Sequence, residues 1–170
     1  MTTTANMPEY LANVILTHFP GGLFYANEQF YKYHHGAWEQ IEERAHVRHV
    51  LARFFGRNAS AEKINGALTL LKDFRVVPDA ALNPNRNLIC LSNGTLDTTS
   101  YQLLDHSPAH RLTNRTDIEW NPEATCPRWL QFMDEIFAYD SDREQKIAFL
   151  QEWMGYCLVP DASQHKFVWM

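Results

Sequence analysis

The sequence predicts an α+β fold that is rich in helix and contains small antiparallel β-hairpins or a β-meander. Five segments place apolar residues at the i, i+3, i+4 spacing of an amphipathic helix. Two other stretches are short, rich in β-prone or aromatic residues, and broken by turn residues such as Asn93-Gly94. The chain has 170 residues, of which 45% are hydrophobic and 21% charged, and this is the composition of one globular domain.

The first helix is expected over residues 6–19. Asn6 is expected to be its N-cap, and Pro8 falls in the first turn, where a missing N–H costs nothing. The Pro-Gly-Gly run at residues 20–22 ends it. Its apolar face consists of Leu11, Val14, Ile15 and Phe19.

Residues 23–41 are rich in aromatic side chains and are interrupted at Asn27 and Gly36, which predicts two or three antiparallel strands. The aromatic side chains either pack across the strands or form platforms on which bases stack, and cross-strand packing is the favoured interpretation. They are Tyr25, Phe30, Tyr31, Tyr33 and Trp38.

Residues 43–57 and 60–74 predict two further helices, with Gly56 near the end of the first and Ser60 at the start of the second. The break at Asn58 is typical of an αα-hairpin or a helix-turn-helix. The expected buried residues are Val47, Val50, Leu51 and Phe54 in the first helix, and Ile64, Ala67, Leu68 and Leu71 in the second.

The middle of the chain predicts a β-meander without evident chemistry. Residues 87–92 read as a short buried strand, Asn93-Gly94 as a tight turn, and residues 101–106 as a strand that pairs back. A fourth helix is expected over residues 125–137, with Pro127 in its first turn. Its apolar face consists of Trp129, Phe132, Met133, Ile136 and Phe137.

The last helix is expected within residues 139–159, where Ser141 and Glu144 have the spacing of a capping box. A helix that is apolar over so wide a face is expected to be buried on more than one side, between this domain and a neighbour. Its two apolar stripes are Ile147, Leu150, Met154 and Cys157, and Phe149, Trp153 and Tyr156.

The net charge of −5 argues against a nucleic-acid partner for the chain as a whole, but the charge is unevenly distributed. Residues 43–75 hold seven basic and three acidic side chains, whereas residues 117–161 hold three basic and ten acidic ones. The basic helix pair has two interpretations: a merely solvated basic face, which is the favoured one, and a local surface that contacts phosphates. The candidate nucleic-acid-binding residues are Arg44, Arg48, Arg53, Arg57, Lys63, Lys72 and Arg75.

The sequence offers no catalytic residue, nucleotide-binding residue, metal ligand or cofactor site. It contains neither GxxxxGK[ST] nor GxGxxG, which excludes an ATPase built on such a loop for this chain alone. No CxxC or HExxH accompanies His46 and His49. The carboxylates at residues 134–135 and 140–144 fit helix termini better than Mg²⁺ ligands.

Four motifs in residues 87–170 carry a family resemblance: NGTLD, HRLTNR, CPRWLQFMDEIF, and FLQEWMGYCL followed by KF. Together they resemble the domain that precedes the helicase core in phage and plasmid primase-helicases, a domain named after the poxvirus primase-helicase. Residues 30–41, FYKYHHGAWEQI, and the two helices after them are also similar to that domain, though less specifically.

The resemblance implies that residues 1–163 form an accessory domain, with sub-regions 1–75, 76–120 and 121–159. It also implies that residues 164–170 begin the first strand of a superfamily 3 helicase core. A Walker A loop follows that strand in the family, so the motor of the parent protein, with its ATP and Mg²⁺, is expected outside this chain.

The function implied is that of an accessory domain in a mobile-element DNA replication protein, which helps a helicase ring to assemble or to engage single-stranded or forked DNA. Two alternatives stay open: a winged-helix DNA-binding regulator, and an oligomerisation collar that does not bind DNA. The collar alternative places self-association, or contact with the helicase core, on Trp153, Tyr156, Phe167 and Trp169.

No membrane partner is expected, because no apolar run approaches the roughly 20 residues of a membrane-spanning helix. The N-terminus lacks the basic and apolar regions of a secretory signal. Cys90, Cys126 and Cys157 are scattered and odd in number, which indicates reduced thiols. These features predict that the protein is located in the cytoplasm of a bacterial host.

Overall fold

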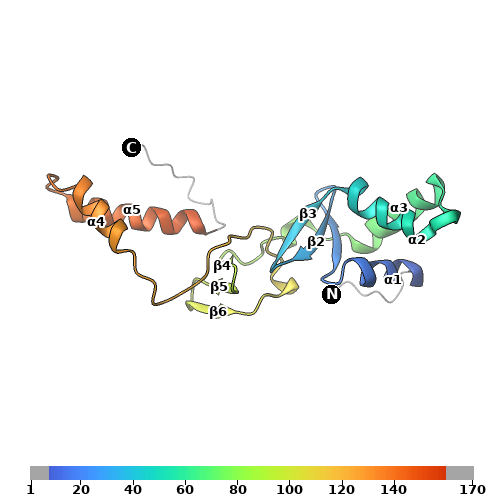
Figure 1. The fold of residues 1–170 in the computed structure, drawn as a ribbon, viewed down its shortest axis with the longest axis horizontal. Coiled ribbons are helices and arrows are strands. Elements are labelled where there is room, and N and C mark those ends of the chain that lie inside the picture. Colours follow the sequence, from blue (N-terminus) through green and yellow to red (C-terminus); the bar gives the residue numbers. More distant parts are fainter. Residues whose placement is uncertain (1–7, 160–170) are drawn as a thin grey trace.

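The structure, a computed structural model, describes residues 8–159 (Figure 1). Three helices and a three-stranded sheet form one end, a second three-stranded sheet lies in the middle, and a pair of helices forms the other end. This is an α+β architecture, as the sequence predicts. The placement of the predicted N-cap Asn6, and of the expected start of a helicase core at residues 164–170, lies outside the described residues.

The first helix packs beside a three-stranded antiparallel sheet, so the prediction of two or three strands in residues 23–41 is confirmed. Two-residue turns join the strands, and both residues of each turn have positive φ, a backbone conformation that matches the twist of a hairpin. The elements are α1 (Glu9–His18), β1 (Leu23–Ala26), β2 (Gln29–His34) and β3 (Ala37–Ile41), in the sheet order β1-β2-β3.

The turn between β2 and β3 requires a glycine for two reasons. Gly36 has φ of 88°, and a Cβ at this position would lie 2.3 Å from Nδ1 of His106. Nearby, Nε1 of Trp38 donates a hydrogen bond to the carbonyl of Pro108 at 3.0 Å. This hydrogen bond joins the first sheet to residues 106–108, which follow the second sheet in the sequence.

The basic helix pair follows β3, but its first helix is not regular throughout. It starts as a π-helical turn, η2 (Glu43–Arg48), and continues as α2 (His49–Phe55). A short 3-10 turn, η3 (Gly56–Asn58), leads to α3 (Ala61–Arg75). Ser60 caps α3 as predicted, because its Oγ accepts a hydrogen bond from the backbone N–H of Lys63 at 3.2 Å.

One face of the first sheet packs against α1, α2 and α3 and forms the main core. The predicted buried stripe of α1 is confirmed at all four positions. In the helix after β3 the prediction is wrong at Phe54, which is 46% exposed, while Phe55 packs on the core in its place. The buried side chains of this core include Leu11, Val14, Ile15, Phe19, Phe30, Val47, Leu51, Ala67, Leu68 and Leu71.

The opposite face of the sheet carries a second, smaller apolar cluster of aromatic side chains. Phe24 lies at its centre, with ring centroids 4.9 Å from Tyr31 and 4.5 Å from Trp38. Cross-strand packing therefore accounts for the aromatic side chains of this sheet, as the favoured interpretation predicted. Phe30, Tyr31 and Trp38 are buried and cannot serve as platforms for bases.

The second sheet is the predicted β-meander, in the order β4-β5-β6 and antiparallel throughout. A later segment runs beside β4: the backbone N–H of Thr116 donates to the carbonyl of Cys90 at 3.0 Å. The side chain of Asn93 then pairs with the backbone of Trp120, donating to its carbonyl and accepting from its N–H, each at 2.9 Å. The strands are β4 (Leu88–Cys90), β5 (Thr95–Asp97) and β6 (Gln102–Leu104).

Two helices, α4 (Pro127–Ile136) and α5 (Arg143–Leu158), form the far end. The predicted capping box at Ser141 is wrong, because α5 begins at Arg143 and its N-cap Asp142 makes no capping hydrogen bond. Lys146 instead pairs with Asp140 at 2.6 Å and with Asp142 at 3.0 Å.

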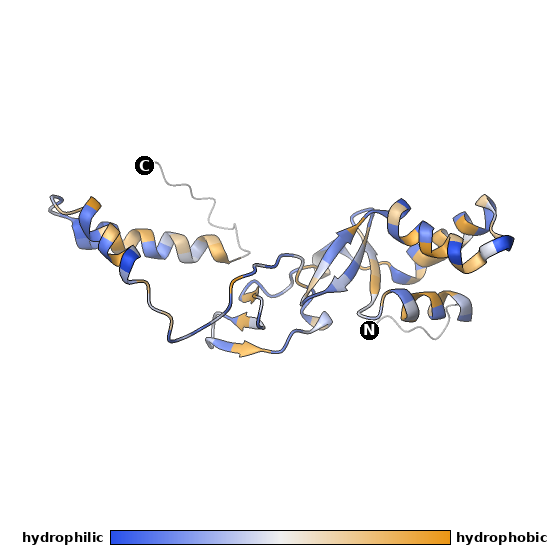
Figure 2. Cartoon of the chain, viewed as in Figure 1, coloured by the Kyte–Doolittle hydropathy of each residue, from blue (hydrophilic) through white to orange (hydrophobic). Residues whose placement is uncertain are grey.

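The apolar faces of α4 and α5 are mostly uncovered within residues 8–159 (Figure 2). Only Met133 is buried in α4, and α5 has no buried residue. Phe132 and Ile136 are each 49% exposed. The burial expected for these stripes is therefore not provided by the described part of the chain. Among the helices described, none is long and apolar enough to cross a membrane.

The burial pattern predicts unequal effects of truncating leucines. Leu51→Ala removes a fully buried side chain from the main core and should lower the free energy of unfolding by about 2–5 kcal/mol. Leu130→Ala, at a position in α4 that is 44% exposed, should cost less than about 1 kcal/mol. Urea denaturation followed by circular dichroism measures both, and equal losses would contradict the assignment of the core.

Candidate nucleic-acid interface

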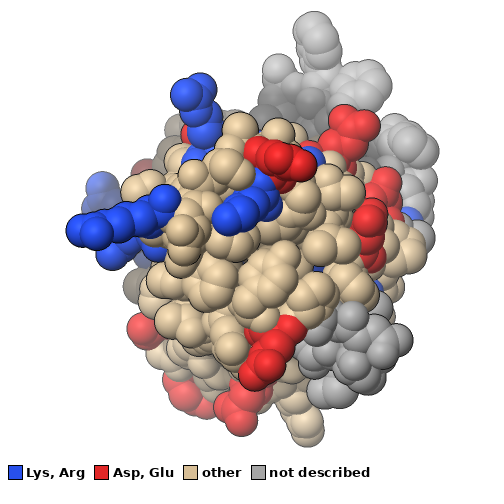
Figure 3. Space-filling model, turned by 90° about the vertical axis from the view of Figure 1, so that its right-hand side faces the viewer, with Lys and Arg blue, Asp and Glu red and all other residues tan. Residues whose placement is uncertain are grey.

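All seven predicted nucleic-acid-binding residues lie on the helix pair formed by η2, α2, η3 and α3. Figure 3 views the molecule from this end. Basic side chains gather toward its upper left, next to an uncharged area; one acidic side chain adjoins them near the top, and others lie toward the right and lower edges. The environments of the seven side chains differ, and this difference decides which of them can contact phosphates.

Glu43 compensates the charge of two of the seven. Its Oε2 lies 2.8 Å from Nζ of Lys72, and its Oε1 lies 3.7 Å from Nη1 of Arg48. Arg48 also donates a hydrogen bond to Oδ1 of Asn65 at 2.9 Å. These contacts tie η2 to α3, so both cations act in the packing of the helix pair.

The hydrogen bond to Glu43 raises the pKa of Lys72. Nζ of Lys72 also lies 5.0 Å from the centroid of the Tyr25 ring, a cation–π distance. Arg75, at the end of α3, is half-buried, and burial lowers its pKa. Its Nε is buried without a hydrogen-bond partner in the described residues. Neither side chain is presented freely to a ligand.

The other four predicted residues are exposed. Arg44, Arg53 and Arg57 form no hydrogen bond or ion pair with residues 8–159. Lys63 donates to the carbonyl of Asn58 at 3.1 Å, which holds its ammonium group near the turn between α2 and α3. No acidic residue occurs from Arg44 to Ala61. The geometry therefore narrows the candidate interface to these four cations.

Phe54 is a candidate binding residue that the sequence pattern assigned to the core. The motif Phe54-Phe55 offers two adjacent rings, and only one of two adjacent helical residues can face the protein core. The spacing Val47, Leu51, Phe55 is i, i+4, i+8 and defines the buried face. Phe54 then falls off that face, beside Arg53 and Arg57.

The predicted interface residues of the collar alternative are only partly described. Trp153 and Tyr156 are half-buried on α5, with ring centroids 5.7 Å apart. Phe167 and Trp169 lie outside the described residues.

Within residues 8–159, no three His, Cys, Asp or Glu side chains are grouped as a metal ion requires. Cys90 lies 3.9 Å from Nδ1 of His106, but it is buried, and burial raises the pKa of its thiol. A raised pKa disfavours the thiolate that nucleophilic catalysis needs.

The profile of the family described as D5 N terminal like matches residues 12–138 of this chain. The match extends from α1 to just beyond α4, so it includes the four exposed cations. No curated protein matches the chain.

The three cysteines are expected to differ in reactivity. Cys126 and Cys157 are exposed and should react with Ellman's reagent in the native protein, whereas buried Cys90 should react only after unfolding. Absorbance of the released thionitrobenzoate, with and without denaturant, counts the two classes. In a Cys126→Ser/Cys157→Ser double variant the fast phase should disappear; a fast phase that persisted there would show Cys90 to be accessible.

Proposed function

The chain belongs to the D5 N-terminal-like family, the domain that precedes the helicase of phage and plasmid primase-helicases, and we propose that its role there is to engage DNA. The contacts are made by Arg44, Arg53, Arg57 and Lys63. The protein acts in the bacterial cytoplasm, where a phage or plasmid replicates. ATP and Mg²⁺ act in the superfamily 3 helicase core of the parent protein.

The observation that carries this proposal is a set of exposed cations that form no ion pair with the described residues. The stretch from Arg44 to Ala61, which holds three of these cations, contains no acidic residue, and Glu42, Glu43 and Glu62 flank it. Such a surface binds the nucleic-acid backbone with an affinity that falls as salt rises.

Removing these charges tests the proposal. An Arg44→Gln/Arg53→Gln/Arg57→Gln variant should bind DNA more weakly, and each lost phosphate contact should reduce the slope of log affinity against log salt by about 0.7–0.9. Fluorescence anisotropy with single-stranded, duplex and forked DNA at several salt concentrations measures both quantities.

Arg128→Gln is the matched control, because Arg128 is an exposed arginine on α4, outside the proposed surface. It should leave affinity and slope unchanged. If the triple variant behaves like wild type, DNA engagement by this surface is refuted. Binding restricted to duplex, without preference for single strands or forks, would favour the winged-helix alternative.

A second candidate function, the assembly collar, is favoured by the uncovered apolar faces of α4 and α5. Phe132 of α4 and Phe149 of α5 are 49% and 51% exposed. Arg128, Trp129, Gln131, Phe132 and Glu135 line an open surface hollow of about 620 Å³. Exposed apolar area of this kind marks contact surfaces in soluble proteins.

The collar predicts that the chain self-associates through α4 and α5. Light scattering over a range of concentrations should give a mass above the 19.8 kDa of one chain. A Phe132→Ser/Phe149→Ser variant should return that mass to the monomer value, because it removes two exposed rings from the contact. A monomer at every concentration in both proteins would speak against a collar formed by this chain alone.

A further inference from the structure

The ring of Phe54 is held in place although it is not buried. It stacks on Tyr10 of α1, with ring centroids 6.0 Å apart and an interplanar angle of 20°. It meets Phe55 edge-on at 5.5 Å and 72°. Two aromatic neighbours thus fix its orientation, while almost half of its surface faces solvent. A ring already ordered in this way loses little conformational entropy when a ligand covers it.

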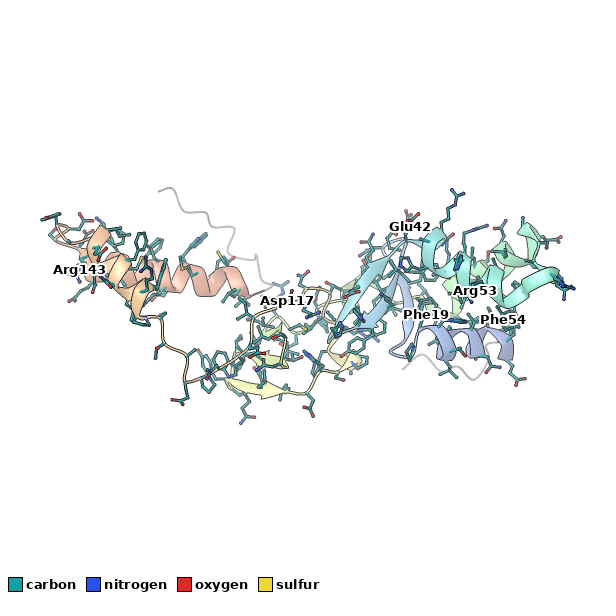
Figure 4. The ribbon with its side chains drawn as sticks, viewed as in Figure 1. Phe19, Glu42, Arg53, Phe54, Asp117 and Arg143 are labelled. Atoms are coloured by element: carbon teal, nitrogen blue, oxygen red, sulfur yellow. The ribbon has the colours of Figure 1, made fainter. Side chains whose placement is uncertain are left out.

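The chain on both sides of this ring is basic. Arg53 precedes Phe54 directly and Arg57 follows it three residues later, and both are exposed and without polar partners in residues 8–159. Figure 4 shows Arg53 and Phe54 at the same end of the molecule, where α2 lies over α1. Of the other large aromatic side chains that are exposed, Phe132, Tyr139 and Phe149 lie in the acidic part of the sequence, and Tyr101 lies in the turn between β5 and β6.

A partner for this combination must supply both a flat apolar face and negative charge. Single-stranded nucleic acid does so, because its unpaired bases stack on aromatic rings while its phosphates bind arginine. In an intact duplex each base face is covered by the next base pair, so the duplex offers phosphates but no free face. An acidic protein segment offers charge without a stacking partner for the ring.

We propose that Phe54 is a stacking platform for a base of single-stranded DNA, with the flanking phosphates bound by Arg53 and Arg57. The inference rests on the proposed DNA engagement and adds the class of substrate, which is unpaired bases. Tyr10 is a positioning residue here, because it supports the Phe54 ring from the side of α1.

The experiment compares the full chain with Phe54→Ala, Phe54→Leu and Phe54→Trp on three labelled probes that carry equal numbers of phosphates. The probes are oligo-dT, the same oligomer without bases, and a duplex. Phe54→Ala and Phe54→Leu should weaken oligo-dT binding by a factor between about 5 and 100, because one base loses its stacking partner. The affinities of these two variants for the other two probes should not change. Phe54→Trp should bind oligo-dT as tightly as wild type, because it keeps an aromatic ring at this position.

Two controls separate stacking from structural damage. Phe54→Leu keeps apolar bulk against Tyr10 and Phe55, so it should fold even if Phe54→Ala does not. Tyr139→Ala removes an exposed aromatic side chain from the turn between α4 and α5, outside both candidate surfaces, and should leave all three affinities unchanged.

Each remaining outcome overturns the inference. If Phe54→Leu binds oligo-dT like wild type, Phe54 is no platform, and the DNA-engaging function stands on the arginine variants alone. If the affinity for the base-free oligomer falls equally, the ring supports the fold and does not stack on bases. A wild-type chain that binds none of the probes refutes both proposals. A dimer that Phe54→Leu dissociates would assign the ring to a second copy of the chain.

Discussion

The packing of three helices on one face of the first sheet is the contact on which the rest of the structure depends. Phe30 of β2 is buried between the sheet and these helices, and Leu51 and Leu71 reach it from α2 and α3. Because Leu51 points inward, the period of α2 turns Arg53 outward, and Arg57 follows in the 3-10 turn η3. The core thus determines which cations face solvent, and the pairing of Glu43 with Lys72 and Arg48 determines which of the others stay within the fold.

Local signals were sufficient for much of the architecture. The one-face spacing of α1 and the cap at Ser60 each depend on residues close together in the chain, and the structure confirms both. The chain reverses between β4 and β5 as predicted, but neither Asn93 nor Gly94 has the positive φ of the expected tight turn, and Leu91 donates to the carbonyl of Gly94 at 2.9 Å. The π-helical turn at Glu43–Arg48 has no such local signature, so a single regular helix was predicted there. The capping-box spacing at Ser141 was misleading, because Lys146 draws the neighbouring carboxylates into ion pairs.

The candidate site was predictable only in part, because contacts between elements far apart in the sequence decide which basic side chains face solvent. Helical spacing identified seven basic side chains, but it could not show that Lys72 meets Glu43 across two helices or that Arg75 is half-buried. Phe54 was assigned to the core by the same spacing, since Phe54 and Phe55 fit an apolar stripe almost equally well. The overall charge is equally uninformative, because a net charge of −5 conceals a basic end and an acidic one.

The two candidate surfaces lie at opposite ends of the molecule, so DNA engagement and assembly do not compete for the same residues (Figure 1).

The hydrogen bonds between Asn93 and Trp120 limit how far the last two helices can stand from the second sheet. They fix the chain at Trp120, and α4 begins at Pro127, so only residues 121–126 connect the two. The seven Cα–Cα steps from Trp120 to Pro127 span at most about 25 Å when fully extended. The turn in which Ala124 donates to the carbonyl of Asn121 at 3.1 Å shortens that span. Any surface that α4 contacts through its first residues must therefore lie within this radius of Trp120, whichever partner provides it.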